Sequence, residues 1–164
     1  MEKITLRPIR ESDREQMYTM LTDDRIKKFY MLPDFENQEQ VENLFRRFIQ
    51  LSGQEDRFVR GMDLDGRLVG FLNDVGTDNR KIELGYVVHP HFWGRGYCTE
   101  GLKQAMERLF AKGFREVVCG AFESNQASIR VMEKAGMEKL DFTESIEYRG
   151  NAHKCVYYGK REVT

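Results

Sequence analysis

Cysteine is scarce in this sequence, and long apolar runs are absent. Three cysteines occur in 164 residues, at wide and irregular spacing. A disulfide framework needs paired cysteines and a structural zinc site needs closely spaced ligands, so neither is indicated. Such cysteine usage is typical of the reducing cytoplasm. No apolar stretch approaches the roughly 20 residues of a membrane span, and no signal peptide follows Met1, so we expect neither membrane insertion nor export.

An excess of one charge sign is also missing. The chain carries 26 Lys and Arg against 27 Asp and Glu, a formal net charge of −1, and its basic residues are spread along the whole length. A nucleic-acid interface or a polybasic membrane anchor would show as a basic stripe. We therefore expect a partner that is neither nucleic acid nor a membrane. With only three prolines and no linker-like tract, residues 1–164 are expected to form a single domain.

Hydrophobic periodicity predicts the order of strands and helices. Period-two patterns predict strands at 3–9, 57–63, 67–75, 81–90, 115–122, 137–148 and 153–161. Helical periodicity predicts helices at 11–23, 37–53, 98–112 and 124–136, the first two capped by Ser12 and Asn37. Only the stretch 81–122 has the strand–helix–strand pattern of a parallel crossover. The predicted fold class is α/β, in the sense of a mixed α+β sheet with helices on both faces rather than a doubly wound sheet.

A glycine-bearing turn joins the strand and the helix of this crossover. Gly94 and Gly96 flank Arg95 in "HPHFWGRGYCTEGL", residues 89–102. Glycine permits a positive φ and a close approach of the backbone, and the free amides and dipole of a helix N-terminus favour an anion such as pyrophosphate. Arg95 is positioned to add a charge-assisted contact. The turn therefore predicts an anion site.

Three alternatives exist for this turn. A nucleoside-triphosphate P-loop fails because Gly96 is followed by Tyr97 rather than by lysine. A Rossmann fingerprint requires a third small residue where Thr99 stands and an acidic residue closing the next strand, for which Glu123 is late. The third interpretation is a tight turn that requires glycine only for its backbone geometry and binds no ligand. The two glycines considered by themselves do not exclude it.

The residues around the turn resemble a known family. The segment His91-Phe92-Trp93-Gly94-Arg95-Gly96-Tyr97 resembles the acetyl-CoA pyrophosphate loop of the Gcn5-related N-acetyltransferase (GNAT) superfamily, with His91 where Arg or Gln is usual. Together with "ESNQASIRVMEKAGM", residues 123–137, it resembles the branch of ribosomal-protein-alanine N-acetyltransferases (RimJ/RimL-like). The resemblance is strongest over 82–137. It implies the acyl-CoA N-acyltransferase fold, a central, twisted and mostly antiparallel sheet with a parallel β-α-β cofactor unit.

The resemblance implies that acetyl-CoA is the cosubstrate. The pantetheine arm would lie in a gap beside the strand before the loop, next to the main chain of Val87 and Val88, with an irregularity tolerated at Gly85. Main-chain amides from Gly94 to Thr99 would hold the pyrophosphate. The cofactor-binding residues that the resemblance implies are Val87, Val88, His91, Trp93, Gly94, Arg95, Gly96, Tyr97, Cys98, Thr99, Asn125 and Ser128.

The resemblance also points to catalytic candidates. Ser128, one turn after Asn125, would lie near the thioester sulfur, whereas Met132 occupies the position at which many relatives carry a tyrosine acid. Glu83 alternates with apolar neighbours and is a candidate base for the amine, as is Glu147 in the last-but-one strand. Each carboxylate is also explained as a solvated strand residue. Catalysis by proximity alone, without a general base, also stays open. Aligning the amine and the thioester lowers the activation barrier of the transfer by as much as ~7–11 kcal/mol.

These expectations combine into direct, acetyl-CoA-dependent transfer of an acetyl group to a primary amine, on a small molecule or a protein N-terminus, with no covalent acyl-enzyme. One alternative is a non-catalytic coenzyme-A-binding or sensing module. Another is acyl transfer through Cys98, whose place in the first turn of a helix favours the thiolate. No metal is expected, because His89 and His91 have no evident third ligand. Whether the chain forms a homodimer is left open.

The acceptor pocket is expected between residues 23–40 and the final hairpin. Asp23, Asp24 and Asp34 in the first of these segments would attract a cationic amine, although a solvated loop explains them as well. The scaffold that the resemblance implies acetylates several kinds of amine, so the acceptor itself does not follow from the sequence.

Overall fold

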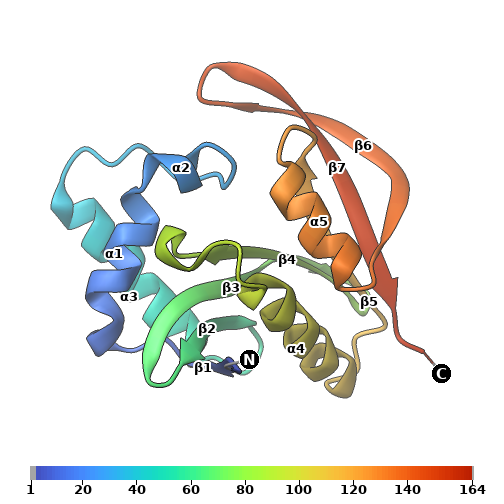
Figure 1. Cartoon of the computed structure of the whole chain (residues 1–164), viewed down its shortest axis with the longest axis horizontal. Helices are drawn as coiled ribbons and strands as arrows, with labels where there is room; N and C mark the ends of the chain where they lie inside the picture. Colours follow the sequence, from blue (N-terminus) through green and yellow to red (C-terminus); the bar gives the residue numbers. More distant parts are fainter. Residues whose placement is uncertain (1–2, 164) are drawn as a thin grey trace.

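A computed structural model describes residues 3–163, so Met1 and Glu2, which precede the predicted first strand, and Thr164 lie outside it. The strands are β1 (Thr5–Arg7), β2 (Val59–Leu64), β3 (Arg67–Asp78), β4 (Lys81–Val88), β5 (Glu116–Phe122), β6 (Glu138–Tyr148) and β7 (Asn151–Arg161) (Figure 1). The helices are α1 (Arg14–Thr22), α2 (Asp24–Lys27), α3 (Gln38–Ser52), α4 (Tyr97–Ala111) and α5 (Gln126–Lys134). Two short 3₁₀ turns cover Glu11–Asp13 and Pro90–Phe92.

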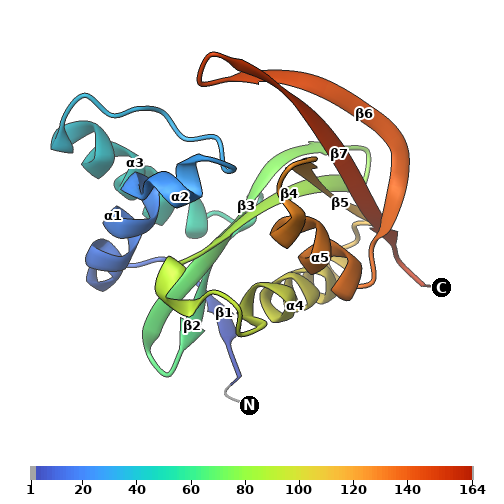
Figure 2. The same ribbon diagram turned by 45° about the horizontal axis from the view of Figure 1, so that its top comes forward.

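The strands form one seven-stranded sheet in the order β1-β2-β3-β4-β5-β7-β6. Neighbouring strands are antiparallel except for β4 and β5, which are parallel and are connected by α4. This confirms the predicted mixed sheet with its single β-α-β unit. The β6–β7 hairpin extends beyond the other strands and reaches from α5 toward α2 (Figures 1 and 2).

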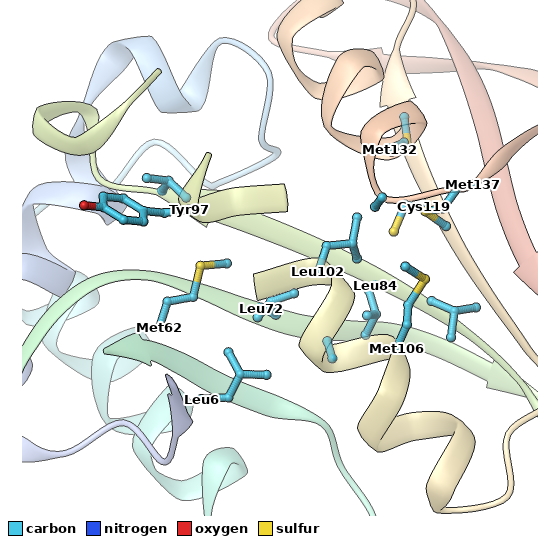
Figure 3. Packing of buried hydrophobic residues seen from close by; sticks show 14 of the residues in the cluster. Leu6, Met62, Leu72, Leu84, Tyr97, Leu102, Met106, Cys119, Met132 and Met137 are labelled. Carbon is cyan, nitrogen blue, oxygen red and sulfur yellow. The ribbon is translucent and has the colours of Figure 1, made fainter. Parts of the chain in front are cut away.

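Helices cover both faces of the sheet, and each face has its own apolar core. On one face, α4 and α5 pack onto the sheet through a cluster that includes Leu84, Met106 and Met132 (Figure 3). On the other face, α1 and α3 pack against a cluster that includes Phe71 and Val87. Because side chains alternate along a strand, successive residues of β4 belong to different clusters. The two sides of β4 therefore face different surroundings.

Capping of α3 follows the prediction. Asn37 Oδ1 accepts the N–H of Gln40 at 3.0 Å at the start of the helix, and Gly53 follows the last helical residue, Ser52, as the C-cap. The single turn of α2 was not predicted, because four residues are too few to show a helical period.

The predicted cap at Ser12 is wrong. Residues 11–13 form a 3₁₀ turn and α1 begins only at Arg14. The reason is the neighbouring Asp13, whose buried carboxylate accepts the N–H of Arg10 at 2.9 Å and binds the guanidinium of Arg7. The hydrogen bond from the Arg10 N–H to Asp13, together with the ion pair between Asp13 and Arg7, thus takes the place of the predicted Ser12 cap.

A gap opens between β4 and β5 because their pairing is short. The parallel pairing ends at Leu84 opposite Cys119, and the two strands separate beyond this point. The irregularity predicted at Gly85 lies elsewhere, since Gly85 pairs in regular register with Asn73 and the register shift occurs in β3 at Val75. Val75 is 60% exposed, so the extra residue of the bulge is placed in solvent, where it disturbs no core packing.

Gly70→Ala is expected to lower the free energy of unfolding by about 1–3 kcal/mol. A Cβ at Gly70 would lie 2.5 Å from the carbonyl oxygen of Val87, so β3 and β4 would have to move apart. Gly76→Ala in the same strand is the matched control, because no atom lies within 4 Å of its added Cβ. Urea unfolding of both variants checks the prediction, and equal stabilities would contradict it.

Candidate functional site

A cleft of about 640 Å³ lies at the gap between β4 and β5. Its walls come from the carboxyl end of β4, from Gly120 and Ala121 of β5, from the first turns of α4 and α5, and from residues 25–30 around α2. The cofactor residues predicted from the sequence that line it are Val87, Val88, Trp93, Gly94, Gly96, Tyr97, Cys98, Thr99, Asn125 and Ser128. Residues up to 109 positions apart in the chain, Arg25 and Lys134, meet in this cleft.

The N-terminus of α4 forms the outer part of the cleft. Gly96 caps the helix with φ +81°, and Gly94 has φ +76°. No atom lies within 4 Å of a Cβ built at either position, so the turn is open as well as left-handed. Because the first-turn amides of a helix have no partner within the helix and its dipole is positive at this end, the turn is suited to an anion.

His91 and Arg95, also predicted as cofactor-binding residues, are not among the residues that line the cleft. Both side chains lie against the ring of Phe92, with centroid distances of 5.7 Å for the His91 ring and 5.6 Å for the Arg95 guanidinium carbon. The His91 N–H is also turned inward and donates to His89 Nδ1 at 3.1 Å.

Trp93 forms a wall of the cleft, and its indole forms a hydrogen bond with a main-chain carbonyl of β4. Its ring is 46% exposed and lies 5.5 Å from the guanidinium carbon of Arg25. Its Nε1–H donates to the Val88 carbonyl at 2.7 Å. The indole therefore uses one of the two lone pairs of the Val88 carbonyl, part of the main chain that the sequence predicts to lie beside the pantetheine.

The first turn of α5 brings three polar groups together. Asn125 Oδ1 caps the helix by accepting the Ser128 N–H at 3.2 Å, so the residue both caps α5 and lines the cleft. Ser128 Oγ lies 2.6 Å from the hydroxyl oxygen of Tyr86 on β4. The sequence did not point to Tyr86, because strand alternation alone predicts an apolar core position there. Met132, in the place of the usual tyrosine, is fully buried in the core.

Cys98 lines the cleft as a thiol rather than a thiolate. Burial raises the pKa of this cysteine to about 12. A protonated thiol is a weak nucleophile, so the acyl transfer through Cys98 considered as an alternative is not supported. The helix N-terminus was expected to lower this pKa, but the apolar surroundings outweigh it.

Two glutamates lie on the far face of the sheet, beside the gap. Burial raises the pKa of Glu83, and the negative charge of Glu144 raises it further. Tyr157 donates a hydrogen bond to Glu144 Oε1, and a Cβ on Gly120 would lie 2.6 Å from the Tyr157 ring. Glu83 is thus a partly buried carboxylate with a raised pKa, the property expected of a general base that acts near neutral pH.

Glu147, the second candidate base, does not share this face. It is exposed and pairs with Ala152, whereas Glu144 pairs with Cys155 on the same face as Glu83. Side chains alternate along β6, and the hydroxyl of the adjacent Tyr148 points toward α2. Glu147 therefore points the other way, and Glu144 is the acidic residue beside Glu83.

The segment around α2 lines the cleft, as predicted, whereas no residue of the β6–β7 hairpin is among the lining residues, and the hairpin instead contacts the α2 segment. Tyr148 donates to the carbonyl of Lys27, and this hydrogen bond ties the two segments together. Asp34 pairs with Lys27 at 2.9 Å, and Asp23 accepts the Arg25 N–H at 2.8 Å as the cap of α2. These two aspartates are occupied by neighbouring groups of the protein, and Asp24 does not line the cleft.

Two absences hold for residues 3–163, the part of the chain that the structure describes. No cluster of three or more His, Cys, Asp or Glu side chains in this range is arranged to hold a metal ion. No helix in the described part of the chain has the length and apolar character needed to cross a membrane.

Comparison with known proteins identifies the family. An uncharacterised N-acetyltransferase of Bacillus subtilis, YoaA, is 27% identical over 144 residues, which cover 84% of this chain and 81% of that protein. The spermidine N(1)-acetyltransferase of Escherichia coli K12 is 20% identical over 162 residues, or 94% of this chain and 86% of the relative. The structure of RimL, the ribosomal L7/L12 alpha-N-protein acetyltransferase, with coenzyme A has a TM-score of 0.84 at 19% identity and covers 97% of this chain and 94% of that one. The family model described as the acetyltransferase (GNAT) domain matches residues 3–138, and the chain therefore belongs to the GNAT acetyltransferases.

Proposed function

We propose that this protein is an acetyl-CoA-dependent N-acetyltransferase of the RimJ/RimL-like branch that transfers an acetyl group directly to a primary amine. The observation that carries the proposal is the continuity of the cleft, which runs from the N-terminus of α4 to the gap between β4 and β5. Its outer part suits the pyrophosphate of coenzyme A, and its inner, largely apolar part suits the neutral pantetheine arm. Membership of the GNAT family supports acetyl-CoA as the donor.

In this proposal each part of acetyl-CoA has its own neighbours. The amides from Gly94 to Thr99 bind the pyrophosphate, and Trp93 covers the approach. The pantetheine lies between β4 and β5 beside Val87, with the thioester near Ser128 at the inner end. The three cysteines are all unpaired in the structure, which supports a cytoplasmic location.

The acetyl transfer proceeds without a covalent enzyme intermediate. The amine nitrogen attacks the thioester carbon and the C–S bond breaks, with its electron pair moving to sulfur. Glu83, directly or through a water molecule, accepts the proton that the nitrogen loses. Ser128 donates a hydrogen bond to the departing sulfur. Much of the rate comes from alignment of the two reactants, which is worth up to ~7–11 kcal/mol.

The acceptor enters from the face of the sheet that carries Glu83. Spermidine acetyltransferase and the protein N-terminal acetyltransferase RimL are both similar to this chain, so a small amine and a protein N-terminus are both acceptors of the right chemistry. We favour a protein N-terminal amine, because the residues from Glu123 to Met137 resemble those of the ribosomal-protein branch.

Calorimetric titration with acetyl-CoA, followed by a screen for coenzyme A release with amines and peptides, tests the proposal. Micromolar binding together with amine-dependent release is the expected result. Binding without release for any amine would instead favour a coenzyme-A-sensing module, which the buried Met132 would suit because it supplies no acid. No binding by the folded protein would refute the acetyltransferase function.

Glu144→Gln is expected to move the acidic limb of the kcat/KM profile to lower pH. Glu83 accepts a proton only when it is ionised, and burial and the nearby charge of Glu144 raise its pKa. Removing that charge makes ionisation easier, so the pKa of Glu83 falls and activity at acidic pH rises. Glu147→Gln is the discriminating variant, since that residue lies on the other face. A shift in Glu147→Gln but not in Glu144→Gln would contradict the assignment.

A further inference from the structure

Tyr86 is a polar side chain in the cleft to which no role has yet been assigned. It lies on β4 two residues after Leu84, the last residue paired with β5, and so stands where the gap begins. Its side chain points to the face covered by α4 and α5, and its ring packs against the apolar cluster there. Its hydroxyl oxygen lies 2.6 Å from Ser128 Oγ, a contact in which either oxygen can donate, and the hydroxyl also donates to the Ser128 carbonyl oxygen at the longer distance of 3.2 Å.

The protonation of this pair limits what it can do. Burial, together with Cys119 and Cys98, raises the pKa of Tyr86 well above its ordinary value, so the phenol keeps its proton. Each hydroxyl has one proton to donate. When Tyr86 donates to Ser128 Oγ, the Ser128 proton is left free to point into the cleft. Gly120 and Ala121, which also line the cleft, have no polar side chain, and Asn125 Oδ1 already accepts the Ser128 N–H at 3.2 Å.

We propose that Tyr86 is a positioning residue that donates its hydrogen bond to Ser128 Oγ and thereby directs the Ser128 hydroxyl at the sulfur of coenzyme A. This inference rests on the proposed function, which puts the thioester at the inner end of the cleft. It gives the enzyme a donor for the leaving group where Met132, fully buried, cannot act as one.

The proton balance of the reaction leaves both hydroxyls unchanged. As the C–N bond forms and the C–S bond breaks, the electron pair moves to sulfur and the Ser128 O–H stabilises the thiolate by hydrogen bonding. The proton that the amine loses to Glu83 or water equals the proton that the sulfur gains from solvent before coenzyme A leaves. Tyr86 is a neutral donor throughout, because a phenolate would be costly in its buried position.

The test is the pKa of the coenzyme A thiol bound to the protein, followed by the ultraviolet absorbance of the thiolate with the free protein as blank. Tyr86→Phe is expected to raise this pKa by about one unit, because a hydrogen bond to a charged group contributes roughly 1.5–3 kcal/mol and one unit is about 1.4 kcal/mol. Ser128→Ala should raise it at least as much. The double variant should match Ser128→Ala alone, since Tyr86 acts only through Ser128.

Tyr158→Phe is the matched control, because it removes a hydroxyl from the same apolar cluster but outside the lining of the cleft. It should leave the thiol pKa unchanged. Equal thiol pKa values in the wild-type protein and in Tyr86→Phe would overturn the inference and leave the proposed function standing. An added effect of Tyr86→Phe in the Ser128→Ala background would also overturn it, since Tyr86 would then contact the sulfur independently. Failure of the wild-type protein to bind coenzyme A would overturn both proposals.

Discussion

Gly96→Glu is expected to weaken acetyl-CoA binding by about two orders of magnitude or more, as measured by calorimetry. The residue caps α4 with φ +81°, at the amides that we assign to the pyrophosphate. A glutamate there places a negative charge beside two phosphates, and the added side chain enters the open space in which they would lie. Charge-assisted hydrogen bonds contribute roughly 1.5–3 kcal/mol each, and 1.4 kcal/mol is a tenfold change in affinity.

The substitution also strains the backbone, and a matched variant separates that strain from the loss of binding. Gly66, in the β2–β3 turn, has φ +88° and no atom within 4 Å of an added Cβ. Gly66→Glu thus introduces the same charge and a similar conformational cost, on the order of 1–2 kcal/mol, away from the cleft. It should lower thermal stability about as much as Gly96→Glu and leave affinity for acetyl-CoA unchanged. Equal affinity in all three proteins would remove the pyrophosphate from this turn.

Arg7→Met is expected to lower the free energy of unfolding by about 3–5 kcal/mol. The guanidinium joins two largely buried carboxylates, with Nε 2.6 Å from Asp63 Oδ1 and Nη1 2.8 Å from Asp13 Oδ2. The side chains of these aspartates are only 13% and 4% exposed. Methionine fills a similar volume but leaves two negative charges without their partner, and desolvated charges without a partner are strongly destabilising.

Acid pH should reduce the difference in free energy of unfolding between Arg7→Met and the wild-type protein. Burial by itself raises the pKa of Asp63, but hydrogen bonds, chiefly from Arg7, hold it below its ordinary value. A carboxylate with a lowered folded-state pKa contributes stability above its unfolded pKa, near about 4, and loses it as the pH falls through the folded value. Urea unfolding measures the difference in free energy of unfolding between the two proteins. This difference should therefore be large at neutral pH and smaller at acidic pH.

Arg161→Met provides the control for loss of an arginine charge. Its side chain is 84% exposed and lies 4.0 Å from Glu116, so its removal should change stability by less than about 0.5 kcal/mol. If Arg7→Met were no less stable than Arg161→Met, Arg7 would not be needed to stabilise the two buried carboxylates in the folded protein.

Apart from α2, the order of the elements followed from the sequence alone, as did the single parallel unit and the glycine turn. Each depends on neighbours in the chain: the period of apolar residues sets strand or helix, Asn37 caps the helix that follows it, and only glycine readily adopts the positive φ found at Gly94 and Gly96. Local rules predicted these features because local interactions determine them.

The tertiary structure decided which side chains meet at the site. Tyr86 and Ser128 are 42 residues apart and come together because β4 and α5 pack on one face of the sheet. Glu144 rather than Glu147 joins Glu83 because the register of β6 against β7 puts alternate side chains on opposite faces. Strand register and packing between distant segments are non-local, since a shift of one residue reverses the side each residue faces, and no local pattern in the sequence encodes that choice.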